Sequence, residues 1–132
     1  MTLPRRRFLT GAAAAVAAPW LASGPHAADA EFQLLSYQFY LSAASDAAAL
    51  TAAAAAKERF LARYPAFRGI VELRLFLAVD YRDLSRQYRS SGDAVNARKY
   101  ERLARSECER IVRTYPRTDQ ADAARQMLAG LR

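Results

Sequence analysis

Residues 109–128 read ERIVRTYPRTDQADAARQML, and this stretch decides what fold we expect for the chain. Its first half is a helical sequence that ends at Tyr115-Pro116, because a proline restrains the residue before it from helical geometry. A short polar link follows. Ala121 and Ala124 then begin the narrow apolar seam of a second helix. The stretch therefore predicts a pair of helices joined by a short turn.

The first half of this stretch has a second copy. Residues 58–65 read ERFLARYP and match ERIVRTYP at an offset of 51 residues, so a second helix is expected to end at Tyr64-Pro65. Periodicity in this range is typical of stacked helix-pair repeats. The physical reason is that one helical hairpin cannot bury its apolar face alone, whereas stacked hairpins share it.

The remaining segments fit the same plan. We expect helices at about residues 31–44, 46–63, 68–90, 93–114 and from Thr118 or Asp119 onward. Gly92 favours the left-handed conformation that ends a helix, and Asp93 favours the N-cap of the next one. The segment 31–44 also fits strand alternation, so helix and strand stay open there. The pattern as a whole predicts an all-α fold, a short α-solenoid of about five antiparallel helices.

The repeated text resembles the tetratricopeptide-repeat proteins, especially the longer-helix periplasmic kind of the outer-membrane assembly lipoprotein and Tol-Pal accessory families. The resemblance covers residues 46–132. Its signature residues are Tyr64, Pro65, Tyr115, Pro116, Ala121 and Ala124. The resemblance implies a protein-binding scaffold with a concave groove that accepts a peptide or a partner helix.

Residues 1–30 are interpreted as a targeting segment that does not belong to the fold. The alanine-rich run within it is too short, and too interrupted by proline and glycine, for a transmembrane span. The basic start of the segment resembles the twin-arginine signal, which an export receptor reads as an address. Its key residues are Arg5, Arg6, Phe8 and Leu9. An ordinary secretory signal is the alternative.

Cleavage is expected after Ala30, since Ala28 and Ala30 present the small side chains that a signal peptidase accommodates. The product, residues 31–132, would be a soluble periplasmic or secreted domain. The first thirty residues hold three of the 20 basic residues and one of the 13 acidic ones, so the product has a formal charge of about +5. The single histidine, His26, leaves with the signal.

The absence of histidine from residues 31–132 limits the chemistry. Ser-His-Asp and Cys-His hydrolysis both need an imidazole base. Zinc and most transition-metal sites draw on His and Cys ligands, and one cysteine cannot supply them. The three remaining glycines form no phosphate-binding loop. We therefore predict no enzymatic activity, no catalytic residues, no metal and no cofactor. A carboxylate-pair hydrolase survives in principle, but no pair of acids stands out.

Cys108 is the single cysteine, so no internal disulfide can form. It shares a helical face with Ala104 and Ile111, which favours a small core residue. The alternative is a reactive thiol or an intermolecular disulfide.

Two surfaces are candidates for binding. One is a basic patch on two consecutive helices, made of Arg82, Arg86, Arg89, Arg98, Arg102 and Arg105. If the two faces adjoin, the patch would attract an acidic partner or anionic lipid headgroups. Otherwise it is a solvated face neutralised by Asp83, Glu101 and Glu109. The second candidate is the aromatic cluster Phe32, Tyr37, Phe39 and Tyr40, which either docks a partner or seals the end of the solenoid.

The leading hypothesis is an exported, non-enzymatic scaffold or adaptor that binds another protein or peptide, in cell-envelope assembly, and that is able to oligomerise. One alternative is an accessory subunit of an exported redox enzyme, because twin-arginine export handles folded, cofactor-bearing complexes. Another is a basic helical module on an anionic membrane surface. A nucleic-acid partner is not expected in this compartment.

Overall fold

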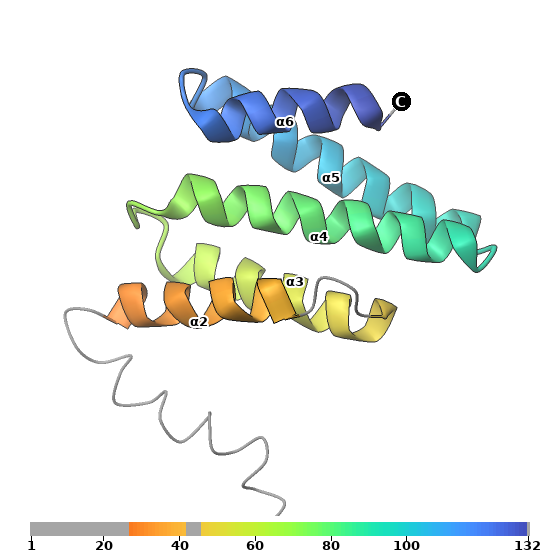
Figure 1. The fold of residues 1–132 in the computed structure, drawn as a ribbon, viewed down its shortest axis with the longest axis horizontal. Helices are drawn as coiled ribbons and strands as arrows, with labels where there is room; N and C mark the ends of the chain where they lie inside the picture. The colour runs from red at the N-terminus through yellow and green to blue at the C-terminus, as the bar shows by residue number, and fades with distance from the viewer. Residues whose placement is uncertain (1–26, 42–45, 132) are drawn as a thin grey trace, which may run out of the picture.

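The computed structural model describes residues 27–41 and 46–131, and every regular element in these two ranges is an α-helix (Figure 1). The helices are α2 (Ala27–Leu41), α3 (Ala47–Arg63), α4 (Ile70–Ser90), α5 (Ala94–Thr114) and α6 (Asp119–Gly130). The expected all-α architecture and the expected number of helices are confirmed for these residues. None of these helices is long and apolar enough to cross a membrane.

The helices form two layers, with α4 in the middle of the molecule. Figure 1 shows α2, α4 and α6 stacked in the front layer, with α3 and α5 behind them. Contacts join each helix to the next in sequence and also join α4 to α2 and α6. The helix expected at 68–90 is therefore covered by other helices on several sides. Its buried apolar residues are Ile70, Leu73, Leu77, Ala78, Tyr81 and Leu84.

The repeated sequence forms two equivalent helix ends. Tyr64 follows α3 with φ −127° and ψ 64°, and Tyr115 follows α5 with φ −129° and ψ 56°. The backbone N–H of each tyrosine donates to the carbonyl four residues earlier, at 2.8 Å in both cases. The proline after each tyrosine prevents the helix from continuing. The internal match at an offset of 51 residues thus corresponds to a shared local structure.

The predicted caps are also present. Asp93 accepts a hydrogen bond from the backbone N–H of Asn96 at 3.1 Å, and Thr118 accepts one from Ala121 at 3.0 Å. Gly92 has φ +83°, the left-handed conformation in which a Cβ would be strained. These signals end and begin helices because they act within one turn of chain, without help from the rest of the fold.

The first helix differs from its predicted limits. The segment 31–41 is helical, so the strand interpretation is wrong for these residues, and the helix begins four residues earlier than expected, at Ala27. Cleavage after Ala30 would therefore remove its first turn, which includes Asp29 and its 3.6 Å ion pair with Arg68. Residues 42–45 and the export signal, with Arg5, Arg6, Phe8 and Leu9, lie outside the described residues.

Candidate functional site

Two adjoining hollows lie where α6 ends against α4 and α5. The first has a volume of about 140 Å³ and is lined by Arg82, Ser85, Arg86, Arg89, Glu101, Gly130 and Leu131. The second has a volume of about 150 Å³ and is lined by Arg89, Gly92, Ala94, Ala97 and Arg98. Arg89 lines both hollows. We call them together the arginine groove.

The groove exists because α6 is shorter than the two helices it packs on. With 12 residues, α6 extends about 18 Å, whereas α4 and α5, with 21 residues each, extend about 31 Å. Figure 1 shows α6 ending well before the turn that joins α4 to α5. At and beyond that end, the small residues Gly130 of α6 and Ala97 of α5 leave space between the helices.

One carboxylate organises part of the groove. Glu101 accepts from Arg89 through Oε1 at 3.0 Å and from Arg105 through Oε2 at 2.9 Å. Arg105 also donates to the Leu131 carbonyl at the end of α6, at 3.1 Å. Because each oxygen of Glu101 already accepts from a guanidinium, its charge is largely committed to holding Arg89 and Arg105 in position.

The other arginines of the groove are less fully paired. Arg82 lies 3.3 Å from Asp83, a neighbour on its own helix. Arg86 and Arg98 are exposed and form no ion pair with any residue in the two described ranges. Among the lining residues, four arginines face one acidic residue, Glu101. The groove therefore has an excess of positive charge.

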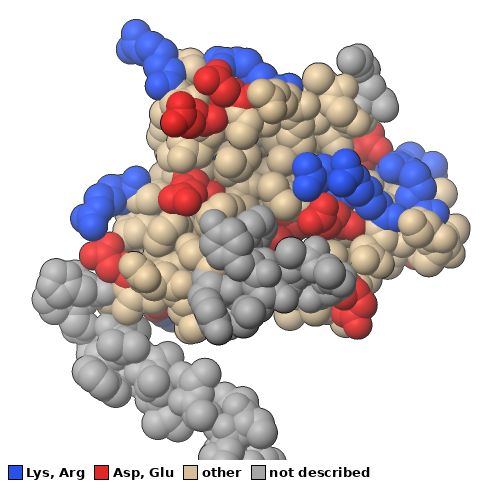
Figure 2. All heavy atoms as spheres, viewed as in Figure 1, with Lys and Arg blue, Asp and Glu red and all other residues tan. Residues whose placement is uncertain are grey.

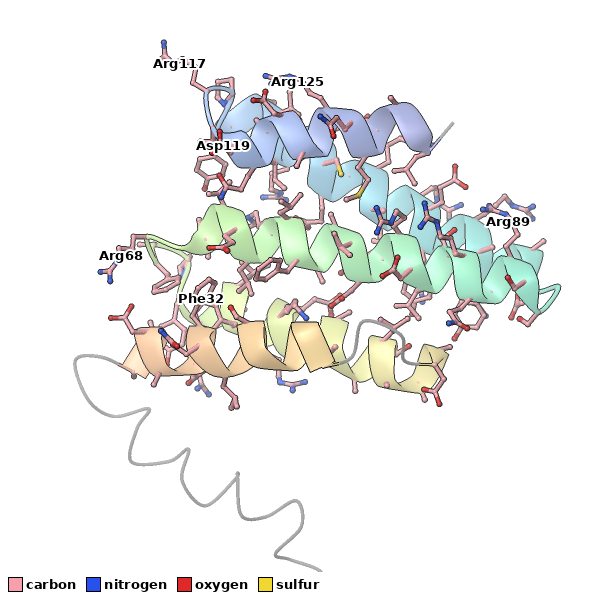
Figure 3. All side chains as sticks on the ribbon, viewed as in Figure 1. Phe32, Arg68, Arg89, Arg117, Asp119 and Arg125 are labelled. Atoms are coloured by element: carbon pink, nitrogen blue, oxygen red, sulfur yellow. The ribbon has the colours of Figure 1, made fainter. Side chains whose placement is uncertain are left out.

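The structure brings most of the predicted basic patch together. Arg82, Arg86, Arg89 and Arg98 line the groove, and Arg105 joins it through Glu101. Arg102 is exposed on α5 and lines neither hollow. Figure 2 shows Lys and Arg side chains gathered on the right, beside the end of α6, and Figure 3 labels Arg89 at this end.

The acids expected to neutralise the patch take different roles. Asp83 pairs with Arg82, and Glu101 pairs with Arg89 and Arg105, as the solvated-face interpretation requires. Glu109, however, forms no ion pair with the arginines of the patch within the described chain, so that part of the expectation is wrong. Glu109 lies on an exposed part of α5, away from the groove. The positive charge of the basic patch is therefore only partly neutralised by these acids.

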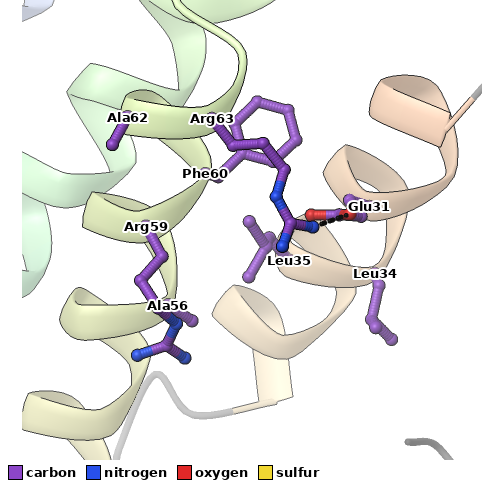
Figure 4. Close-up of a pocket in the computed structure, with 8 residues that line it drawn as sticks. All are labelled: Glu31, Leu34, Leu35, Ala56, Arg59, Phe60, Ala62 and Arg63. Atoms are coloured by element: carbon purple, nitrogen blue, oxygen red, sulfur yellow. Dashed lines mark hydrogen bonds and ion pairs between the residues drawn. The ribbon is translucent and has the colours of Figure 1, made fainter. Parts of the chain in front are cut away.

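A third, more apolar hollow lies between α2 and α3 (Figure 4). Its volume is about 560 Å³, and its lining residues are Glu31, Leu34, Leu35, Ala56, Arg59, Phe60, Ala62 and Arg63. Glu31 accepts from Arg63 at 2.9 Å and from the Tyr64 hydroxyl at 3.0 Å. Leu34 remains 46% exposed at its rim.

The aromatic cluster near the start of α2 is only partly described. The Phe32 ring lies 5.2 Å from the Phe67 ring and 6.5 Å from the Phe60 ring, measured between centroids. Figure 3 shows Phe32 pointing into the molecule beside the link between α3 and α4. Phe32 therefore packs against one ring from α3 and one from the link between α3 and α4. The side chains of Tyr37, Phe39 and Tyr40 lie outside the described part.

An ion pair inside the fold was not predicted. Lys57 of α3 and Asp80 of α4 are both buried, with Nζ 2.7 Å from Oδ2. Burial raises the pKa of Asp80, an effect that the hydrogen bond from Lys57 and its positive charge oppose. Neither residue lines the arginine groove or the hollow beside α2. The available signal was a charged residue on an apolar face in each of two neighbouring helices.

Cys108 lies in the core, as one interpretation predicted. It has no exposed surface, and its Sγ lies 3.5 Å from Sδ of Met127. Burial raises its pKa to about 11, so the thiolate that would react as a nucleophile is disfavoured. Within the described residues, no group of three or more His, Cys, Asp or Glu side chains is placed to hold a metal ion.

No protein-family model matches the chain, and no match is found among curated proteins or solved structures.

Proposed function

We propose that this protein is an exported, non-enzymatic adaptor that binds another protein through the arginine groove. The observation that carries the proposal is the groove itself, an open hollow between stacked helices. Two of its arginines, Arg86 and Arg98, have no ion-pair partner in the described residues. Exposed charges held at the edge of a concave surface are suited to recognising a partner of opposite charge.

The helical stack supports a scaffold of tetratricopeptide-repeat type. The front layer of α2, α4 and α6 and the back layer of α3 and α5 follow the order of successive hairpins (Figure 1). Equivalent helix ends at Tyr64 and Tyr115 follow equivalent helices of the back layer. Stacked hairpins of this kind create extended concave surfaces, which such proteins use for binding. We therefore propose a short α-solenoid as the architecture behind this function.

The export signal indicates the compartment in which the proposed adaptor acts. The twin-arginine pattern at Arg5 and Arg6 indicates a route across the inner membrane, and the small residues at Ala28 and Ala30 indicate release from it. A histidine-free product has few means of catalysis and acts through its surfaces. We propose cell-envelope assembly as its setting.

Site-specific photocrosslinking in intact cells tests the adaptor function. A photoreactive amino acid would replace Ala94 or Gly130, exposed residues that line the groove, so that every arginine is kept, and Gln126 on the exposed side of α6 as the control. We expect the same discrete protein adduct from both groove positions and none from the control, with the partner identified by mass spectrometry. A partner with redox cofactors would favour the accessory-subunit alternative. Failure to form any adduct at either groove position would contradict the proposal.

A further inference from the structure

Taking the proposed adaptor function as its basis, we infer that the partner segment in the arginine groove is acidic and extended, with closely spaced carboxylates. Four arginines line the groove, and the acidic residue among them, Glu101, already accepts from Arg89 and Arg105. A ligand that supplies carboxylates would form ion pairs with the arginines of the groove that Glu101 does not contact. Guanidinium groups suit this task because their planar donors match both oxygens of a carboxylate.

The spacing of the arginines favours an extended segment. Arg82 and Arg86 are four residues apart on α4, which places them about 6 Å apart along the helix axis. Alternate side chains of an extended chain are about 6.8 Å apart and point to the same side. An acidic segment with carboxylates at every second residue would therefore meet successive arginines. Small residues at Gly92, Ala94 and Ala97 allow a peptide backbone to come close.

The shape of the groove favours a protein segment over a membrane surface. Arg82 lies deep in the groove, with its side chain 29% exposed, and Arg105 beside the groove is 35% exposed; both are held by acids of the same protein. The exposed residues Arg86, Arg89 and Arg98 lie around them at the rim. Recessed arginines of this kind can be reached by a projecting carboxylate. A flat layer of headgroups makes its best contacts with arginines on a protruding face, where the long side chains extend freely.

Peptide binding to the purified chain tests this inference. The probe is a fluorescent peptide with alternating Glu and Ser, and the control peptide has Gln in place of Glu. We expect the acidic peptide to bind at about 20 mM salt. Binding should weaken as the salt is raised to about 200 mM, because added ions shorten the Debye length and screen the attraction between the charges. The double variant Arg86→Glu/Arg98→Glu should weaken binding by about tenfold or more.

A matched variant separates the groove from general positive charge. Arg110→Glu/Arg117→Glu changes the net charge equally on exposed residues that line neither hollow, and Figure 3 shows Arg117 at the opposite end from Arg89. We expect this variant to bind within about twofold of the unmodified chain. Circular dichroism would establish that both variants fold, and Arg86→Gln/Arg98→Gln would replace the first variant if it did not.

Three results would overturn the inference. They are equal weakening by the two double variants, no binding of the acidic peptide at low salt, and binding to vesicles containing phosphatidylglycerol without binding to the peptide. The crosslinking experiment keeps the underlying function separate. A protein adduct at Ala94 or Gly130 together with no peptide binding would contradict the acidic segment but support the adaptor function, whereas no adduct would contradict both.

Discussion

Nζ of Lys57 lies 2.7 Å from Oδ2 of Asp80, and the two side chains are 0% and 2% exposed. The pair links α3 to α4 in the interior of the molecule. At the offset of 51 residues, Lys57 corresponds to Cys108, which instead makes a sulfur contact with Met127. The two hairpins therefore bury different chemistry at equivalent positions. Because desolvation offsets much of the attraction in a buried pair, we expect this one to specify how α3 and α4 align rather than to add much net stability.

Removing one partner of this pair should be strongly destabilising. Asp80→Ala leaves the Lys57 ammonium buried without that carboxylate, and we expect the free energy of unfolding to fall by about 3–5 kcal/mol. Urea denaturation followed by circular dichroism would measure the change. The double variant Lys57→Met/Asp80→Leu is the control, since it removes both charges. It should lose less stability than the single variant, and an equal or greater loss would contradict the interpretation.

The turn between α4 and α5 should depend on a glycine. Gly92 has φ +83°, so Gly92→Ala forces a Cβ into the left-handed region and should cost about 1–2 kcal/mol. Gly130→Ala is the matched control. A Cβ added at either glycine would have no neighbouring atom within 4 Å, so neither substitution causes a clash. The two differ in that Gly130 does not have a positive φ. Thermal unfolding should show a lower Tm for Gly92→Ala alone. Similar Tm values for the two variants would contradict the role of the turn.

The protein should lose stability at alkaline pH. Burial raises the pKa of the Cys108 thiol to about 11, and it also raises the pKa of Tyr81, which donates a hydrogen bond to Glu58. The folded chain thus holds these protons more tightly than the unfolded chain, in which a thiol has a pKa of about 8.5. Their contribution is complete below the unfolded pKa and is lost as pH rises through the folded one.

Urea midpoints measured from about pH 8 to about pH 11 would reveal this loss, the range being that of the unfolded and folded thiol. In Cys108→Ala, the part of the fall in urea midpoint with rising pH that the thiol causes should disappear. The variant is nevertheless less stable at every pH, because the substitution leaves a small cavity. The native thiol should also react slowly with alkylating reagents and rapidly in urea. An unchanged slope in Cys108→Ala would exclude the thiol as a contributor.

Export should depend on the arginine pair near the N-terminus. Arg5→Lys/Arg6→Lys keeps the charge but removes the guanidinium groups, which lysine does not replace in geometry. We expect the precursor to accumulate in the cytoplasm, as measured by cell fractionation and immunoblotting. Arg7→Lys is the control, because Arg7 lies outside the pair, and it should be exported normally. Normal export of the double variant would favour the general secretory route.

Local signals in the sequence were sufficient to predict the helices from residue 47 onward. Tyr64-Pro65 and Tyr115-Pro116 end α3 and α5, and Thr118 begins α6, because each acts on backbone groups within one helical turn. The burial of Cys108 was predictable for a similar reason, since helical periodicity places it on one face with Ala104 and Ile111. The start of α2 was not predicted, because residues 27–30 were assigned to the export signal and neither His26 nor Ala27 is a residue type that favours an N-cap.

By itself, the sequence determined that the chain from residue 47 onward is helical, where most of its helices end and which residues could make a basic surface. Only the tertiary structure decided that Lys57 meets Asp80 and that Arg82 and Arg98 share a groove while Arg102 does not. The physical reason is distance. Caps and helical faces depend on neighbours within a few residues, whereas an ion pair or a groove depends on how α4, α5 and the shorter α6 pack together.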